Sequence, residues 1–180
     1  IDYAYVSDFE PLKELIHLKS LILGSTNISN LEPISNLTNL KTLSIDSTKV
    51  TSLNSIKGLR NLTSLSLGST PVSDFKVIKD FTNIEYLDLD NTCFFDLDLL
   101  KNLTNLSILY FSGTTVTNLE PLKKLPNLHI LNMFGTLVSD LQPLKELQNL
   151  KEICINNCPN ITDEQVDDLQ KALPNCKIVR

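Results

Sequence analysis

The apolar residues of this chain recur with a period of 22 residues. Segments that align without a gap and share the pattern LxxLxLxxTxVxxLxxLxxLxN begin at Leu18, Leu40, Leu62, Ile84, Leu106 and Leu128. In each copy the fourth and sixth positions are apolar and alternate with polar residues, which predicts a short strand with one buried side. The apolar positions 1, 11, 14, 17 and 20 are expected to point inward as the chain turns back.

One copy cannot bury its apolar side alone, so the copies must stack against their neighbours. Stacking predicts an α/β repeat fold, a solenoid with a parallel sheet on its concave face. At about 4.8 Å per coil, seven strands would span roughly 30 Å. We expect a single repeat domain over residues 1–180. Residues 1–17 fit the end of a further copy, 18–149 hold six complete copies, and 150–180 form a longer terminal copy with a cap.

The return segments predict one short helical turn of 3₁₀ or α type per copy, on the convex face. Prolines that can start such a turn follow polar residues that can cap it, as in the pairs Asn30 and Pro33, Asn118 and Pro121, and Asp140 and Pro143. In the terminal copy, Thr162 precedes DEQVDDLQKAL, which predicts a capped amphipathic helix of about three turns. We expect its polar outer face to close the C-terminal end of the core.

Two polar positions also recur. Position 9 is threonine in all six complete copies, and its hydroxyl can bond backbone groups left open where the strand ends. Position 22 is asparagine, which suits a tight turn into each strand. Both series are interpreted as structural. The threonines are Thr26, Thr48, Thr70, Thr92, Thr114 and Thr136, and the asparagines are Asn39, Asn61, Asn83, Asn105, Asn127 and Asn149.

The core does not dictate the outward positions of the strands, so function is sought there. These positions are mostly small and polar in the first three copies and become large and apolar, with acidic neighbours, in the fourth to sixth. A patch of this kind is typical of a contact site. The alternative is that cross-strand pairs merely stabilise the sheet. The predicted partner-binding residues are Tyr86, Asp88, Asp90, Ile108, Tyr110, Ile130, Asn132 and Phe134.

Charge and composition narrow the range of partners. The net charge of −5 argues against nucleic acid, because phosphate binding usually needs a basic surplus. No apolar run is long enough for a membrane span. Four cysteines are too few for a disulfide framework, and they have no matching ligands at zinc-finger spacing, so we expect neither metal nor cofactor. The first residues lack the pattern of a signal peptide, which leaves secreted, surface, host-delivered and cytoplasmic locations open.

Catalytic residues are sparse. His129 stands at position 2, one coil from Ser107 and two coils from Glu85, so a Ser/His/Glu column is geometrically conceivable. A parallel sheet face offers no oxyanion hole or water-excluding pocket by itself. Cys154 is outward-facing, but no sequence feature lowers its pKa. We therefore expect a protein that is not an enzyme.

The pattern TxVxxLxPLxxLxNL resembles the internalin-like class of bacterial leucine-rich-repeat proteins, over almost the whole chain. That resemblance implies a curved, right-handed solenoid that binds protein or carbohydrate-bearing partners on its concave face, without a cofactor or a reaction. We expect a monomeric protein-interaction module whose partner is a protein, glycoproteins included. The alternative is a targeting arm of a larger protein whose enzymatic or anchoring domain is absent from this fragment.

Overall fold

A single parallel sheet of eight short strands in sequence order runs the length of the computed structural model, which describes residue 6 and residues 8–180. From β1 to β7 each strand pairs with the next at a shift of one repeat, so that Leu21 lies opposite Leu43 and Leu43 opposite Leu65, whereas Lys177 of β8 lies opposite Glu152 of β7. The 22-residue period therefore sets the strand register. The strands are β1 Ser20–Ile22, β2 Thr42–Ser44, β3 Ser64–Ser66, β4 Tyr86–Asp88, β5 Ile108–Tyr110, β6 Ile130–Asn132, β7 Glu152–Cys154 and β8 Lys177–Val179.

The return segments form short 3₁₀ helices, as predicted. Before three of them, Asn30, Asn118 and Asp140 accept a hydrogen bond from the backbone N–H two residues later, at 2.9, 3.0 and 2.8 Å. These bonds satisfy an amide group that the first turn leaves open. The helices are η1 Glu10–Glu14, η2 Glu32–Ile34, η3 Asn54–Ile56, η4 Lys76–Asp80, η5 Leu97–Leu100, η6 Glu120–Lys124 and η7 Gln142–Glu146.

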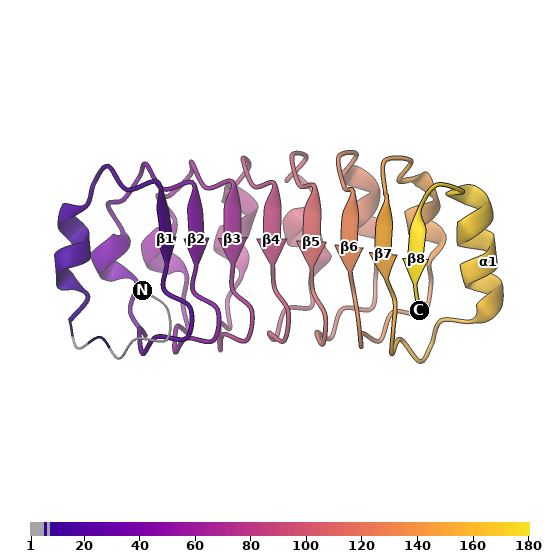
Figure 1. The fold of residues 1–180 in the computed structure, drawn as a ribbon, viewed down its shortest axis with the longest axis horizontal. Helices are drawn as coiled ribbons and strands as arrows, with labels where there is room; N and C mark the ends of the chain where they lie inside the picture. The colour runs from indigo at the N-terminus through magenta and orange to yellow at the C-terminus, as the bar shows by residue number, and fades with distance from the viewer. Residues whose placement is uncertain (1–5, 7) are drawn as a thin grey trace.

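The coil is right-handed (Figure 1). Each strand descends on the near side, the chain returns upward behind it through a 3₁₀ helix, and the next strand lies to its right. The molecule thus has two long faces. We call the side that carries the strands the strand face; it corresponds to the concave side of the predicted solenoid. We call the opposite side the helix face.

One apolar core fills the space between the two faces. In the second copy, the inward residues Leu43, Ile45, Val50, Leu53 and Ile56 are all buried. The same positions are buried in the neighbouring copies and join a single continuous cluster. Each coil therefore depends on its neighbours for burial, as the repeat predicts.

Hydrogen bonds at the two recurrent polar positions have different roles. Each threonine hydroxyl donates to the carbonyl three residues earlier in its own coil, as from Thr26 to Leu23 at 2.7 Å. Each asparagine amide reaches back to the preceding coil instead, as from Asn39 to the Ile16 carbonyl at 2.8 Å. The threonines thus close the bend after each strand, and the asparagines also join successive coils.

The residue before each threonine turns the chain with a positive φ. Serine fills this position in the first three complete copies, with φ near 55° at Ser25, Ser47 and Ser69. Glycine fills it at Gly113 and Gly135, with φ of 65° and 67°. This left-handed conformation suits glycine and strains other residues.

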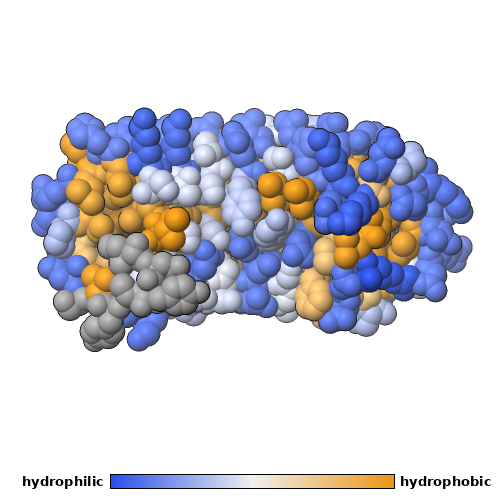
Figure 2. All heavy atoms as spheres, viewed as in Figure 1, coloured by the Kyte–Doolittle hydropathy of each residue, from blue (hydrophilic) through white to orange (hydrophobic). Residues whose placement is uncertain are grey.

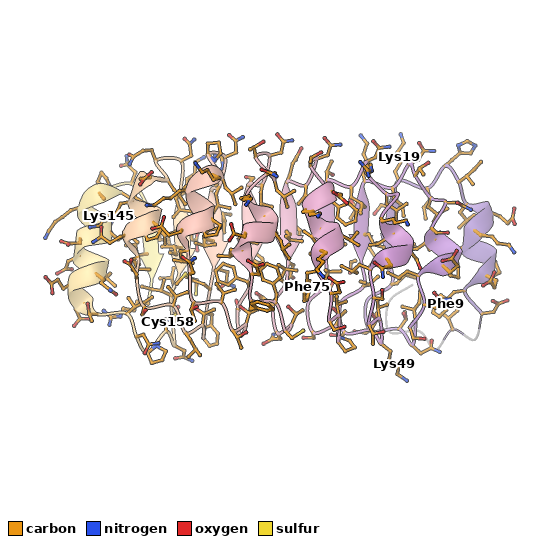
Figure 3. All side chains as sticks on the ribbon, turned by 180° about the vertical axis from the view of Figure 1, so that it is seen from behind. Phe9, Lys19, Lys49, Phe75, Lys145 and Cys158 are labelled. Atoms are coloured by element: carbon orange, nitrogen blue, oxygen red, sulfur yellow. The ribbon has the colours of Figure 1, made fainter. Side chains whose placement is uncertain are left out.

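The C-terminal end is closed by α1, Asp163–Ala172. Thr162 caps this helix in a reciprocal capping box with Gln165, and Lys145 of η7 lies 3.7 Å from Asp168 of α1. Figure 3 shows Lys145 beside this terminal helix. The predicted cap is confirmed. The repeat pattern predicts seven strands, and the structure adds an eighth, β8, which pairs with β7 beyond the helix. Within the described part of the chain, no helix has the length and apolarity needed to cross a bilayer.

Candidate interaction surface on the strand face

The eight predicted partner-binding residues gather on the strand face of β4, β5 and β6. Two rows of paired positions cross these strands. One row holds Tyr86, Ile108 and Ile130, and the other holds Asp88, Tyr110 and Asn132. Asp90 and Phe134 lie two residues beyond β4 and β6. None of the eight side chains is buried, and Phe134 is 41% exposed.

The two tyrosines of this surface contact each other across neighbouring strands. The rings of Tyr86 and Tyr110 meet edge to face, with their centroids 5.6 Å apart. Burial raises the pKa of Tyr86 well above its ordinary value, and the neighbouring Asp88 carboxylate raises it further. Tyr86 is therefore a neutral hydrogen-bonding group on a partly dehydrated surface.

Acidic side chains border the tyrosines. Partial burial raises the pKa of both Asp88 and Asp90. Asp88 Oδ1 accepts the Asp90 N–H at 2.9 Å, and Asp90 Oδ1 accepts the Ser112 N–H at 2.5 Å. Among the described side chains, no lysine, arginine or histidine forms an ion pair with either carboxylate. Their charge is thus left for solvent or a partner to compensate.

Asp46 extends this acidic border and was missed by the sequence analysis. Ser66 Oγ lies 2.5 Å from Asp46 Oδ1 and 3.2 Å from Asp88 Oδ2, so one hydroxyl joins the two carboxylates. Gly68 stands between them, and a Cβ there would lie 3.3 Å from Asp46 Oδ1. A glycine two residues after the outward Ser66 was the available sign of this close approach.

The strands at the N-terminal side present a different surface. Figure 2 shows pale, weakly polar atoms over β2 and β3 and orange, apolar atoms over β5 and β6. The outward residues of β2 and β3 are Thr42, Ser44, Ser64 and Ser66. Exposed apolar residues are not confined to β5 and β6, because Leu15, Ile16 and Ile22 near the N-terminal end are exposed as well.

The conceivable catalytic column is not assembled. His129 Nδ1 lies 2.5 Å from the Asn127 carbonyl and 3.3 Å from Ser107 Oγ. A carbonyl oxygen can only accept, so Nδ1 carries the proton and cannot also take one from Ser107. Among the described residues, no hydrogen bond links Glu85 to either side chain. The described residues therefore do not form a connected Ser/His/Glu column.

The cysteines occupy separate places along the solenoid. Cys158 and Cys176 are buried, whereas Cys93 is exposed and Cys154 is partly exposed. Cys158 replaces the position-9 threonine, and its Sγ lies 3.1 Å from the Met133 carbonyl. No group of three or more His, Cys, Asp or Glu side chains suited to a metal ion occurs in the part of the chain that the structure describes.

Comparison with known proteins agrees with the repeat pattern. A family model described as a leucine-rich repeat region matches residues 5–166. No curated protein is similar to this chain in sequence. Among solved structures, internalin C2 of Listeria monocytogenes is similar with a TM-score of 0.87 and 28% identity, over 99% of this chain and 77% of that one.

Two further structures share the fold. An internalin of Listeria monocytogenes, internalin F, has a TM-score of 0.82 and 22% identity, over 100% of this chain and 58% of its own. The ectodomain of the Arabidopsis thaliana receptor kinase GASSHO1/SCHENGEN3, solved in complex with CASPARIAN STRIP INTEGRITY FACTOR 2, has a TM-score of 0.66 and 21% identity. It matches over 82% of this chain and 19% of that one.

Proposed function

Because the chain belongs to the leucine-rich repeat region family and is internalin-like in structure, we propose that it binds a partner protein across the strand face of β4, β5 and β6. Leucine-rich-repeat proteins are typically interaction modules without enzymatic activity, and the plant receptor ectodomain is an example solved with its own partner. The residues proposed as the site are Tyr86, Asp88, Asp90, Ile108, Tyr110, Ile130, Asn132 and Phe134.

The main support for this proposal is the concentration of partly exposed aromatic and aliphatic side chains on three adjacent strands. A tyrosine pair offers a large contact area at a small cost in side-chain entropy. The unpaired carboxylates of Asp88 and Asp90 favour a partner whose apolar contact is flanked by basic groups. The solenoid scaffold requires none of these outward residues, since β2 and β3 form the same strands with serine and threonine.

Affinity capture with the purified chain tests the proposal. The double variant Tyr110→Ser/Phe134→Ser removes two large side chains from the surface, one on its middle strand and one beyond β6. Both side chains point out of the core, so the fold should be unchanged by circular dichroism. We expect the wild-type chain to capture a protein that the double variant loses, with affinity for the purified partner at least tenfold weaker.

A matched control is Leu137→Ser, which also replaces an exposed apolar side chain but lies outside the proposed surface. This variant should capture the same partner as the wild-type chain. Equal capture by the double variant would remove the strand face of β4, β5 and β6 as the binding site. Loss of capture in both variants would indicate a general effect of surface polarity rather than a local contact.

The alternative of a targeting arm stays a prediction. This chain covers 58% of the internalin F chain, so a similar fold also exists within a longer protein. Under this alternative the strand face would still bind a partner, and a second domain would supply anchoring or enzymatic activity. Recovery of the full reading frame would distinguish the two, because only the targeting arm requires an additional domain.

A further inference from the structure

The fourth repeat departs from its neighbours at a turn away from the strand face. Position 12 is a small hydroxyl residue in the other complete copies: Ser29, Thr51, Ser73, Thr117 and Ser139. In the fourth copy it is Phe95, whose side chain is 69% exposed. The fold does not need an aromatic ring at this place, since five coils turn there without one. The exposed ring therefore calls for an explanation other than packing.

Phe95 forms one wall of a surface hollow of about 390 Å³, which we call the phenylalanine groove. Its floor is made by Phe75 and Phe94, which are buried and meet edge to face with their ring centroids 5.2 Å apart. Leu99 completes the apolar lining. Figure 3 shows Phe75 on the helix side of the molecule, at the lower end of η4. The groove thus lies between the third and fourth coils, apart from the proposed strand-face site.

The rim of the groove is acidic. Asp74 Oδ1 accepts the Lys76 N–H at 3.0 Å, and Asp96 Oδ1 accepts the Asp98 N–H at 3.0 Å. Neither carboxylate forms an ion pair with a described cation. Lys76 also lines the groove, so two carboxylates and one ammonium leave one net negative charge. A ligand that enters this hollow should combine an apolar group with a positive one.

A polypeptide could use the backbone beside the groove as well as its side chains. The N–H of Phe95 makes no hydrogen bond within the described chain. It can therefore donate to the carbonyl of an extended segment that lies along the turn. A volume of about 390 Å³ also accommodates one or two side chains of such a segment.

We propose that the phenylalanine groove is a second docking site, and that it takes an extended segment of a partner protein with an apolar side chain next to an arginine or lysine. The apolar side chain packs on Phe75 and Phe94 under the ring of Phe95. The adjacent cation lies between Asp74 and Asp96. This site is independent of the strand face, because none of its lining residues belongs to β4, β5 or β6.

Selection from a random dodecapeptide library displayed on phage tests the proposal with the chain as it exists. Peptides that bind the wild-type chain are selected and then depleted on the variant Phe95→Ser. Phe95 is mostly exposed, so this variant should keep its fold, as checked by circular dichroism and thermal unfolding. We expect the remaining peptides to share an apolar residue beside a basic one. Their affinity for Phe95→Ser, measured by fluorescence polarisation, should be at least tenfold lower.

The charge component is tested with Asp74→Asn/Asp96→Asn. Asn30 and Asn118 hold the same repeat position and accept the same backbone bond, so the turns should be preserved. We expect the selected peptides to bind this variant about tenfold more weakly and to lose salt dependence. They should bind Tyr110→Ser/Phe134→Ser as tightly as the wild-type chain.

Three results would overturn the proposal. One is that no peptide survives depletion on Phe95→Ser. Another is that the surviving peptides are acidic or carry no apolar residue. The third is that their binding is lost in Tyr110→Ser/Phe134→Ser, which would assign them to the strand face. If Tyr110→Ser/Phe134→Ser loses the strand-face partner but still binds the selected peptides, the two sites are separate. The proposed function and this inference can therefore fail independently.

Discussion

The strands β3 and β4 are neighbours in one sheet, and they differ only on one side. Their inward residues, Leu65 and Leu87, lie opposite each other and are fully buried. Their outward residues are Ser64 and Ser66 on β3 but Tyr86 and Asp88 on β4. The strands keep the same length and register despite this change. Burial against the next coil therefore determines the strand, and the outward side is free to vary.

The same contrast extends to the turns that follow the strands. The first three complete copies use serine at the left-handed position, whereas the copies that contain β5 and β6 use glycine. At Gly113 a Cβ atom would lie 2.5 Å from Asn91 Oδ1 of the preceding coil, but at Gly135 it would meet nothing within 4 Å. The C-terminal copies thus differ from the N-terminal ones in the turn after the strand as well as in the strand face.

The largest expected effect tests the claim that the inward sides are equivalent. Leu65→Ala and Leu87→Ala each remove a fully buried side chain from the centre of a strand. Each should lower the free energy of unfolding by about 3 kcal/mol, through lost burial and a residual cavity. Chemical denaturation of both variants measures the two losses. A difference above about 1 kcal/mol would show that the outward residues also govern the core.

Substitutions of the glycines in the turns should give the next largest loss of unfolding free energy. Gly135→Ala places a side chain at φ 67° and should cost about 1 kcal/mol. Gly113→Ala has the same strain plus the contact with Asn91, so its loss of unfolding free energy should be larger. Thermal or denaturant unfolding of the two variants compares them directly. Equal losses would mean that the Asn91 side chain moves aside without cost.

The tyrosine pair distinguishes two interpretations of the strand face, a contact site for a partner and a set of cross-strand pairs that stabilise the sheet. In a double-mutant cycle of Tyr86→Ala and Tyr110→Ala, we expect a coupling energy of about 1 kcal/mol from the edge-to-face contact. Unfolding measurements on the two single variants and the double variant provide this value. If partner binding survives the double variant while stability falls, the pair serves the sheet alone. Coupling near zero would show that the rings do not stabilise each other.

The smallest expected effect is the contribution of the Asp88 carboxyl to the pH dependence of stability. Its carboxyl pKa is raised in the folded protein because burial removes water from the charged form. The stability that this proton contributes is therefore present below the unfolded pKa, about 3.9, and is lost as pH rises through the folded pKa. Asp88→Asn should thus be more stable than the wild-type chain at pH 7 and nearly equal to it at pH 3.

Denaturation of both proteins between these pH values gives the comparison. The variant should keep its local structure, because Asn132 holds the same position on β6 and accepts the Phe134 N–H at 3.2 Å. Ser64→Ala on the same face is a useful control, since Ser64 lies opposite Tyr86 rather than Asp88 and the change adds no titratable group. A wild-type chain that gains stability over the variant as pH rises would contradict the assigned direction of the pKa shift.

The periodic features of the chain could be predicted because each follows from one repeated local rule. The strands, the buried positions, the Asn30-type caps and the Thr162 capping box all have short-range sequence signals. The side of the sheet that carries Tyr110 and Phe134 follows from the same alternation. Whether these residues bind a partner stays a prediction, because alternation indicates exposure and not affinity.

Other features of the molecule follow only from its tertiary structure. Lys177–Val179 lies beyond the complete copies and becomes β8 because α1 returns the chain beside β7. Asp46 joins Asp88 through Ser66 although 42 residues separate the two carboxylates in the chain. The phenylalanine groove likewise combines Phe75 of one coil with Phe94 and Phe95 of the next. Contacts between coils depend on side-chain direction and size, which a position in the repeat does not specify.

The sequence by itself determined the solenoid, its register and its buried side, because a 22-residue period leaves no other way to cover the apolar residues of every copy. The tertiary structure decided which outward groups meet, from the tyrosine pair to the acidic border and the phenylalanine groove. The physical reason is that burial of apolar area is non-directional and follows the pattern alone. Hydrogen bonds, ring contacts and hollows depend instead on distances and angles that exist only once neighbouring coils are stacked.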